Sequence, residues 1–375
     1  MAGEVEYDVV VALNYYTPYV SGVTEAARVI AEGLAEDGLR VVVIAGRHER
    51  GLAARERINN VDVVRTPVVA RIGKGIISPM FVPTVVRLAR RSRVLIMHAP
   101  MLESGLIATA TRKTPMVTLY HCDVTLPPGL INRVQEKGLD ISHRAAIRLS
   151  ASVVVTSDDY ARHSRLWTAI EGREVVIPPP AITRPKGSPS FRSSEGTHVG
   201  FLGRIVEEKG LEYLVEGFRR LDDPSARLLI GGDYSKVAGG SVVAQVREAI
   251  GDDPRIRLMG FLPNESLADF YASIDIFALP SVNALEAFGL VQVEAMMAGV
   301  PALASDLPGV RMPVRKTGFG VVVPPRDAAA ITAAITQLRD GNLDREAGSR
   351  KTREYYEPRT VVEQFNKLVA SIASH

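Results

Sequence analysis

The sequence predicts an α/β protein built from two doubly wound domains. Short apolar runs typical of buried parallel strands alternate with helical patterns along most of the 375 residues. A stretch rich in proline, residues 177–190, interrupts this alternation, which restarts at His198. The chain is longer than one hydrophobic core usually serves, and 46% hydrophobic against 23% charged residues is typical of globular proteins. Two α/β domains are therefore expected.

The proline-rich stretch sets the expected boundaries. Proline and glycine at this density cannot continue a helix or a central strand, and domain boundaries favour such segments. We therefore expect an N-terminal domain at 1–180, a linker at 181–195, a C-terminal domain at 196–355 and a final helix within 356–375.

The opening of the chain reads as strand, loop, helix and strand. The apolar run 8–13 leads through a loop to a helix at 24–37, and a second strand follows at 41–45. Gly22 ends the loop and, without a side chain, could closely approach a pyrophosphate, with Thr24 capping the helix. The alternative interpretation is an ordinary turn between strand and helix.

The rest of the first domain repeats the pattern less regularly. His121 follows a predicted buried strand directly, at the edge where open α/β sheets bind ligands, although histidines at strand ends are more often structural. The expected strands are 61–65, 94–98, 116–120, 153–156 and 175–177, and the expected helices are 83–91, 101–112 and one starting near 158.

The predicted helix 83–91 combines apolar residues with Arg87, Arg90 and Arg91. A basic amphipathic segment can lie on an anionic membrane surface. The other interpretation, which we favour, is a surface helix packed on the sheet by its apolar side.

In the second domain, a strand at 198–202 is followed by Arg204 and Lys209 on one loop. Two cations at this position can neutralise a diphosphate through charge-assisted contacts, whereas an isolated pair would usually be exposed. The other expected strands are 227–231, 257–260 and 274–279, and the expected helices are 211–221, 288–298 and 360–374.

The most informative stretch is 277–304, where Glu286 and Glu294 stand eight residues apart. Glu286 lies in a loop before a predicted helix, whose start at Phe288, Gly289 and Leu290 offers free backbone N–H groups and a positive dipole end. Two carboxylates flanking such a helix start could hold hydroxyl groups on either side of a phosphate. Two glutamates at this spacing would otherwise be solvated helix residues.

The segment EAFGLVQVEAM resembles the E-x7-E signature of retaining GT-B glycosyltransferases, in particular family 4, and GRIVEEKGLEYL resembles their diphosphate-binding loop. The resemblance covers nearly the whole chain and implies two Rossmann-like domains with an interdomain cleft, the final helix returning to the first domain. It implies that Glu294 binds the ribose and that Arg204 and Lys209 bind the diphosphate. The sugar would be bound by Glu286 and by the backbone of Phe288, Gly289 and Leu290. The base would lie near Phe261 and Leu262. His121 would face the donor sugar, and Gly22 stands where the family usually has two glycines, Ser21 occupying the first place.

Other classes are disfavoured by missing motifs. The chain lacks the D-x-D metal site of the other large glycosyltransferase fold, a G-x-G-x-x-G after the first strand and a G-x-S-x-G elbow. Its single cysteine, Cys122, allows no internal disulfide, and its net charge of +3 includes no basic stripe for nucleic acid. We see no signal peptide and no apolar run long enough for a membrane span, so a cytoplasmic protein is expected.

The sequence therefore predicts a retaining glycosyltransferase that needs no metal and no cofactor. Its partners would be a nucleoside-diphosphate sugar, of UDP or GDP type, and a lipid or glycan acceptor. A lipid acceptor and contact with the inner face of an anionic membrane are suggested by the excess of Lys and Arg in the N-terminal half. The alternatives are a nucleotide-sugar epimerase or a glycan synthase of the same fold, and a non-catalytic nucleotide-sugar binding protein.

Overall fold

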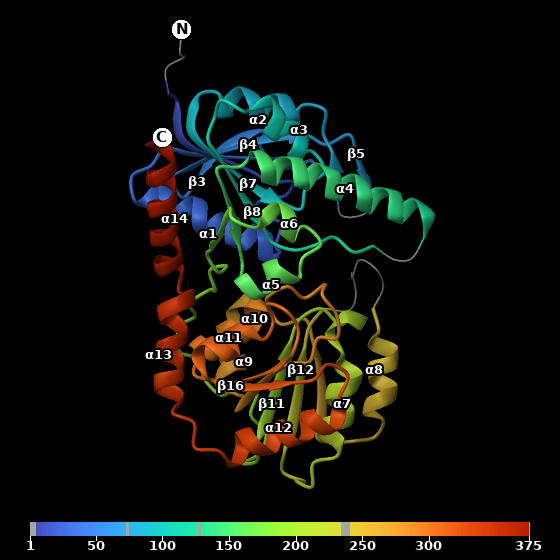
Figure 1. Cartoon of the computed structure of the whole chain (residues 1–375). Helices are drawn as coiled ribbons and strands as arrows, with labels where there is room; N and C mark the ends of the chain where they lie inside the picture. Colours follow the sequence, from blue (N-terminus) through green and yellow to red (C-terminus); the bar gives the residue numbers. More distant parts are fainter. Residues whose placement is uncertain (1–4, 73–74, 127–128, 234–240, 375) are drawn as a thin grey trace. The chain divides into compact units, whose positions relative to one another are not determined.

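The computed structural model describes residues 5–72, 75–126, 129–233 and 241–374 (Figure 1). The chain divides into two compact units: unit 1 comprises Met1–Pro180 with Pro358–His375, and unit 2 comprises Ala181–Glu357. The C-terminal helix thus belongs to unit 1, and the segment 181–195 belongs to unit 2. The expected interdomain cleft stays a prediction.

The described residues of unit 1 form an eight-stranded sheet of order β10-β9-β8-β7-β1-β2-β4-β3. Every neighbouring pair is parallel except β3 and β4, and a separate antiparallel hairpin joins β5 and β6. The strands are β1 (Tyr7–Ala12), β2 (Val41–Arg47), β3 (Arg55–Ile58), β4 (Val61–Pro67), β5 (Ala70–Ile72), β6 (Gly75–Ile77), β7 (Ser92–Ala99), β8 (Met116–Tyr120), β9 (Ser152–Val155) and β10 (Glu174–Val176).

Helices cover both faces of this sheet. Successive residues of β1 point to opposite faces, so they pack against different helices. Val9 and Val11 pack with α1 and α14, whereas Val10 and Ala12 pack with α2, α3 and α4. The helices are α1 (Gly22–Glu36), α2 (Phe81–Ala89), α3 (Ser104–Ala110), α4 (Leu130–Leu149), α5 (Asp158–His163), α6 (Trp167–Ile170) and α14 (Pro358–Ala373).

The described residues of unit 2 form a parallel six-stranded sheet of order β13-β12-β11-β14-β15-β16. Its strands are short and mostly apolar, and β11, β14 and β15 are buried along their whole length, as expected where helices cover both faces of a sheet. They are β11 (His198–Leu202), β12 (Arg227–Gly231), β13 (Ile256–Gly260), β14 (Ile276–Leu279), β15 (Ala302–Ser305) and β16 (Gly320–Val323).

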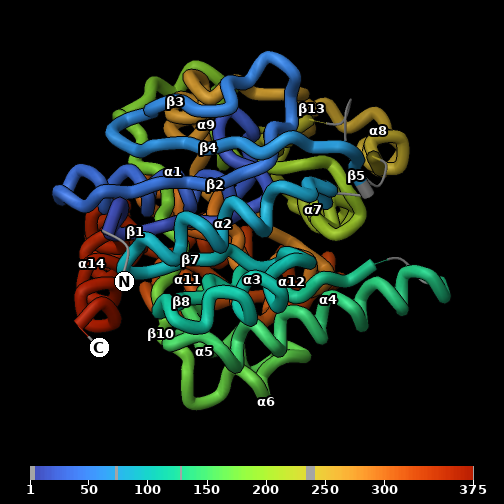
Figure 2. The backbone as a smooth tube through the Cα atoms, turned by 90° about the horizontal axis from the view of Figure 1, so that it is seen from above, coloured from blue at the N-terminus to red at the C-terminus, as the bar shows by residue number. Residues whose placement is uncertain are grey.

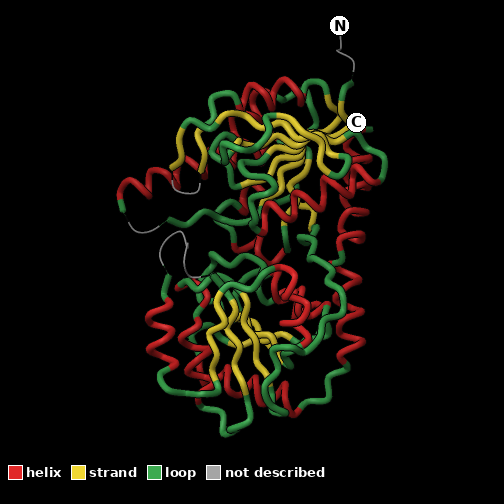
Figure 3. Tube along the Cα trace, turned by 180° about the vertical axis from the view of Figure 1, so that it is seen from behind, coloured by secondary structure: helices red, strands yellow, loops and turns green. Residues whose placement is uncertain are grey.

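Two helical layers complete unit 2, and Figure 3 shows helices flanking the strands. One core joins α7, α8 and α12 to the sheet, and a second joins α9, α10 and α11 to its other face. The helical elements are η1 (Glu207–Lys209), α7 (Leu211–Arg219), α8 (Val243–Ile250), η2 (Asn264–Ser266), α9 (Leu267–Ala272), α10 (Leu290–Met297), α11 (Met312–Thr317), α12 (Ala328–Asp340) and α13 (Arg345–Tyr356).

The expected α/β fold with two doubly wound domains is confirmed, with differences in detail: the sheet of unit 1 carries one antiparallel edge strand, β3. The sequence does not predict β3, whose residues are mostly charged and exposed, or the 20-residue helix α4. The prediction that Thr24 caps α1 is wrong. Ser21 is the cap, because its extended backbone lets its side chain accept from Thr24 N at 3.2 Å.

Helix α2 settles the two interpretations of the basic segment 83–91. Its apolar side chains Phe81, Val85 and Leu88 are buried in the core, so α2 packs on the sheet by its apolar side. No helix within the described ranges is long and apolar enough to span a bilayer.

Candidate functional site

The candidate site of unit 2 lies where the strand order reverses. β11 is the first strand of this sheet, and its two neighbours, β12 and β14, follow it in the sequence on opposite sides. The loops that leave β11 and β14 at their carboxyl ends therefore turn away in opposite directions. In open α/β sheets, ligands bind in the crevice that forms at this point.

Lys209 and Glu286 meet at this point. Lys209 ends η1 in the loop after β11, Glu286 lies in the loop after β14, and the Lys209 Nζ donates to Glu286 Oε2. The two side chains are 12% and 15% exposed, so the pair is largely shielded from water. The structure thus brings together two predicted site residues that are 77 positions apart.

The backbone fixes the two loops against each other. Val282 N donates to Glu208 O at 3.0 Å. Gly210 has φ +60°, and a Cβ at this position would lie 2.4 Å from Pro280 O. Only glycine permits this approach, so the position of Lys209 depends on the residue that follows it.

Arg204, the second predicted cation, lies on the same loop as Lys209. Its guanidinium pairs with Glu208 at 2.9 Å, and its side chain is 47% exposed. The neighbouring loop after β12 comes very close: a Cβ on Gly232 would lie 1.8 Å from Gly203 O. The loops after β11 and β12 therefore form one tightly packed edge that leaves the Arg204 side chain accessible.

Glu294 lies within α10 and is joined to Arg184 rather than to Glu286. Arg184 Nε and one terminal nitrogen are each 2.8 Å from Glu294 Oε2, and the Tyr271 hydroxyl donates to the same oxygen at 3.3 Å. Arg184 also donates to Asn264 Oδ1 at 2.9 Å. Both charged side chains are about nine-tenths buried. Burial and the nearby Glu294 carboxylate raise the pKa of Tyr271, which keeps its hydroxyl a hydrogen-bond donor.

The start of α10 depends on Gly289. This residue has φ +81°, and a Cβ there would lie 2.3 Å from Leu279 Cδ2 and 2.8 Å from Gln292 Nε2. The buried Gln292 amide donates to Phe288 O and Val310 O, each at 2.8 Å. The Phe288 ring packs against Tyr356 in the core, and Leu290 is half-buried. Residues 288–290 therefore present their backbone groups at the site, and the Gln292 side chain holds this backbone in place.

Phe261 and Leu262 follow β13 at the same edge of the sheet. The Phe261 side chain is 69% exposed, whereas Leu262 packs against the core and would contact a Cβ on Gly231 at 2.7 Å. An exposed aromatic ring next to a fixed apolar residue is a suitable surface for the flat face of a base.

In unit 1, His121 follows β8 and is paired with His98 at the end of β7. His98 Nδ1 and His121 Nε2 share a hydrogen bond of 2.9 Å, and the rings lie nearly parallel. Burial lowers the pKa of His121 to about 4 and that of His98 well below its usual value. Both imidazoles are therefore neutral near pH 7.

Gly22 opens α1 after the loop that leaves β1, and it is exposed. In this sheet the strand order reverses at β1, which is flanked by β2 and β7. The loop that ends at Gly22 and the end of β7 that carries His98 therefore lie at the switch point of unit 1. Ser21 is engaged as the helix cap, its Oγ 2.7 Å from Thr24 Oγ1.

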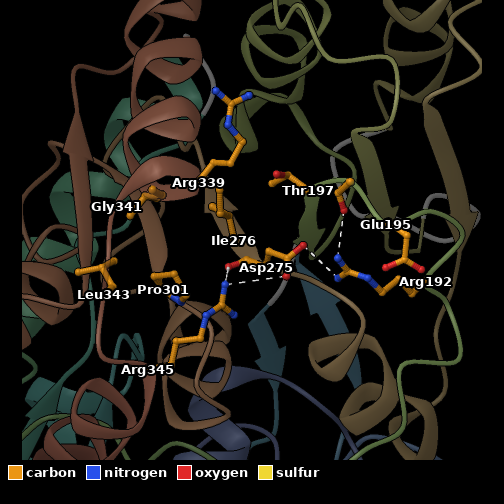
Figure 4. A pocket seen from close by; sticks show the side chains of 12 residues that line it. Arg192, Glu195, Thr197, Asp275, Ile276, Pro301, Arg339, Gly341, Leu343 and Arg345 are labelled. Atoms are coloured by element: carbon orange, nitrogen blue, oxygen red, sulfur yellow. Dashed lines mark hydrogen bonds and ion pairs between the residues drawn. The ribbon is translucent and has the colours of Figure 1, made fainter.

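A separate pocket of about 260 Å³ lies at the opposite edge of the unit 2 sheet (Figure 4). Thr197, Asp275 and Pro301 line it, and they precede β11, β14 and β15. The Asp275 carboxylate is paired within this pocket, since Arg192 contacts it at 3.0 Å and Arg345 contacts it at 3.9 Å. This pocket is distant from the switch point, and none of the predicted site residues line it.

Three residues that hold the site were not predicted: His98, Arg184 and Gln292. His98 ends the strand beside that of His121, and Gln292 is the polar residue inside the E-x7-E segment, so sequence signals existed for both. Arg184 lies in a stretch expected to be linker, and its contact with Glu294 spans 110 positions. No local pattern in the sequence indicates that contact.

Two family models match the chain. The model described as Glycosyl transferases group 1 matches residues 196–340, and the one described as Glycosyl transferase 4-like domain matches residues 21–180. The two matches fall on unit 2 and unit 1 respectively. They include every predicted site residue.

Curated relatives have matching names. A 2-deoxystreptamine glucosyltransferase of Streptomyces kanamyceticus is 26% identical over 63% of this chain and 64% of its own length. A D-inositol 3-phosphate glycosyltransferase of Geodermatophilus obscurus is 25% identical over 68% of this chain and 62% of its own. A phosphatidyl-myo-inositol mannosyltransferase of Mycobacterium leprae is 32% identical over 48% of each. The chain thus aligns with less than two thirds of these relatives' lengths.

Solved structures show the same fold over the whole chain. Sucrose-phosphate synthase from Thermosynechococcus elongatus aligns with a TM-score of 0.79 at 20% identity, covering 98% of this chain and 100% of that one. An Anabaena protein, HepE, in complex with UDP-glucose aligns with a TM-score of 0.71 at 18% identity, with 98% and 100% covered. At these identities the likeness establishes the fold.

Proposed function

Because the chain belongs to the group 1 glycosyltransferases and has the GT-B fold, we propose that it moves a sugar from a nucleoside-diphosphate sugar to a lipid or glycan acceptor. The reaction would retain the anomeric configuration and need no metal ion. The observation that carries this proposal is the Lys209–Glu286 pair at the switch point of the unit 2 sheet.

Unit 2 would bind the donor through groups already in position. Lys209 and Arg204, on one loop, would neutralise the diphosphate, and the exposed Arg204 side chain can reach it without breaking a buried contact. Glu286 would accept hydrogen bonds from sugar hydroxyls while its contact with Lys209 keeps sugar and diphosphate sites adjacent. The backbone of residues 288–290, fixed by Gln292, would supply further contacts to the sugar.

The nucleoside would lie further along the same edge. Glu294 would accept from the ribose hydroxyls, with Arg184 and Tyr271 orienting its carboxylate. Phe261 would stack on the base, beside Leu262. A UDP- or GDP-type donor is proposed, and the UDP-glucose bound by the Anabaena neighbour supports a donor of this class.

The chemistry would rest on stabilising the leaving diphosphate. As the bond to the sugar breaks, negative charge grows on the diphosphate, and Lys209 and Arg204 would stabilise that charge in an oxocarbenium-like transition state. The acceptor would attack from the same face. His121, a neutral imidazole paired with His98, would contribute a hydrogen bond toward the sugar, and Gly22 would leave room for backbone approach. Glu286 is not assigned as a nucleophile.

The test is a donor panel with acceptors supplied. Wild type and Glu286→Ala would be incubated with UDP-, GDP- and ADP-sugars, with and without lipid and glycan acceptors, while freed nucleotide and sugar products are measured. If the protein transfers sugar, nucleotide release should depend on the acceptor, should be lost in Glu286→Ala and should not change when a chelator is added. The sugar in the product should keep the anomeric configuration that it had in the donor. Sugar isomerised without acceptor would indicate an epimerase, and a nucleotide bound but never released from any sugar would indicate a binding protein.

A further inference from the structure

Unit 1 carries a large exposed apolar surface, which we call the α3–α4 face. It consists of Leu102, Leu106, Leu130, Ile131, Val134 and Ile141, whose side chains are 61–78% exposed. Exposed apolar residues scattered singly are ordinary, but a contiguous group marks an interaction surface.

Four of these residues share one side of α4. At about 100° per residue, Leu130, Val134 and Ile141 fall within roughly 40° of one another around the helix axis, and Ile131 borders them. The opposite side of α4 is buried on unit 1 through His143, Ala146 and Ile147. The helix is therefore anchored by one side and presents its other apolar side to solvent.

The two leucines continue this surface onto α3, which carries Leu106, and onto the turn before it, which carries Leu102. Gly105 N donates to Ser142 Oγ at 2.9 Å, and a Cβ on Gly105 would lie 2.8 Å from Ser142 O. This tight contact places Leu102 and Leu106, on either side of Gly105, beside Ile141. Figure 2 shows α3 and α4 side by side.

Charge on α4 is separated in the same way. Arg133, Lys137 and Arg148 are exposed and fall within roughly 60° of one another, on a sector that adjoins and partly overlaps the apolar side. The two acidic residues of the helix are instead engaged with the protein, because Glu136 accepts from Leu126 N and Asp140 pairs with Arg165 at 3.2 Å. The solvent-facing side of α4 is consequently apolar and cationic.

We propose that the α3–α4 face binds the surface of a lipid bilayer that contains anionic headgroups. Its apolar side chains would enter the boundary between headgroups and acyl chains, and Arg133, Lys137 and Arg148 would contact the anionic headgroups. A second copy of the chain fits less well, since a twofold contact would bring these cations together from both copies. The inference does not depend on sugar transfer, although a bilayer is where a lipid acceptor would be met.

Vesicle co-sedimentation of the full chain tests this inference. Wild type should bind vesicles of phosphatidylcholine with phosphatidylglycerol. Binding should weaken when the ionic strength is raised from about 0.1 M to about 1 M, because the screening length then falls from about 10 Å to about 3 Å. The apolar variant Ile131→Gln/Val134→Gln should lower the partition coefficient at least tenfold. The charge variant Arg133→Gln/Lys137→Gln should lower it on anionic vesicles and leave weak binding to pure phosphatidylcholine unchanged.

Matched controls come from the same unit. Val69→Gln/Met80→Gln replaces two other exposed apolar residues, and Arg87→Gln/Arg90→Gln replaces two arginines of α2. Both should bind vesicles like wild type, and all substituted positions are exposed, so thermal unfolding should be unchanged. The proposal is overturned if wild type does not bind anionic vesicles at low salt, or if the α2 variant loses binding while the α4 variants keep it. It is also overturned if the face mediates self-association. In that case wild type would form a dimer and would not bind vesicles, and the apolar variant would be monomeric.

Discussion

Arg184 holds the carboxylate of Glu294 through two nitrogens that lie 2.8 Å from the same oxygen, Oε2. The arginine is fixed in turn by Asn264, and both charged side chains are about nine-tenths buried. The residue proposed to bind ribose is therefore part of a buried ion pair whose other member comes from the segment 181–195, which follows the last strand of unit 1 in the sequence.

Arg184→Gln should destabilise unit 2 and weaken nucleotide binding. Removing one partner of a buried ion pair leaves an uncompensated charge and typically costs about 3–5 kcal/mol. In the double variant Arg184→Gln/Glu294→Gln no buried charge is left without a partner. Its loss of unfolding free energy should therefore be smaller, by about 1–3 kcal/mol, than the sum of the losses in the two single variants. Denaturant unfolding of the four proteins measures this coupling.

The exposed pair Arg220–Glu216 in unit 2 is the matched control. Its side chains are half exposed, so Arg220→Gln should cost about 0–1 kcal/mol. Additive effects of Arg184→Gln and Glu294→Gln would show that the contact does not couple the two residues.

The contrast between Arg184 and Lys209 shows what the sequence could predict. Lys209 follows a strand at the edge where parallel sheets bind ligands, so its position was accessible from periodicity and topology alone. Arg184 follows a run of prolines, and only the folded backbone brings it to Glu294. Side chains that reach a site from irregular segments have no periodic signal.

The same limit applies to whole elements. Strands such as β1 and β11 are continuous apolar runs and were predicted within one or two residues. Helix α4 was missed because its apolar residues lie on two opposite sides, one buried and one exposed, which blurs the helical period. The feature that hid α4 is the one that makes it an interaction surface.

Lys209→Ala should abolish most sugar transfer. Removing one group that stabilises developing negative charge typically lowers kcat by about 10²–10³-fold. Lys316→Ala is the control, since that lysine lies over the Tyr355 ring at 4.3 Å in the same unit, and its loss should leave kcat unchanged. Steady-state kinetics with the donor found in the panel measures both variants. If Lys209→Ala has the same kcat as wild type, Lys209 does not take part in the proposed chemistry.

Gly289→Ala should impair the site beyond the strain of its backbone. A non-glycine residue in the left-handed region costs about 1–2 kcal/mol, and here the Cβ would also lie 2.3 Å from Leu279 and 2.8 Å from the Gln292 amide. Gly318→Ala is a close control, since Gly318 has φ +71° and no atom within 4 Å of a Cβ. Thermal shift with and without nucleotide should show a larger loss of both stability and nucleotide stabilisation for Gly289→Ala. Equal effects of the two substitutions would mean that the contacts at Gly289 have no consequence.

The pairing of His121 with His98 predicts a dependence of stability on pH. Burial lowers the pKa of His121 to about 4, whereas a histidine in the unfolded chain titrates near about 6.5. Between these values the unfolded state binds a proton at this site and the folded state does not, so stability falls as pH falls from 6.5 toward 4. His121→Asn removes this contribution. The difference in unfolding free energy between wild type and His121→Asn should therefore shrink by roughly 1–2 kcal/mol from pH 7 to pH 5, as measured by denaturant unfolding.

Contributions of the carboxylates largely cancel in this difference, because both proteins share them. Transfer by wild type should in addition show no inflection from His121 between pH 5 and pH 8, since the imidazole stays neutral above its folded pKa of about 4. A stability difference that is the same at pH 7 and pH 5 would show that His121 is protonated as readily in the folded protein as in the unfolded chain. Its proposed role as a neutral hydrogen-bonding group would then fail.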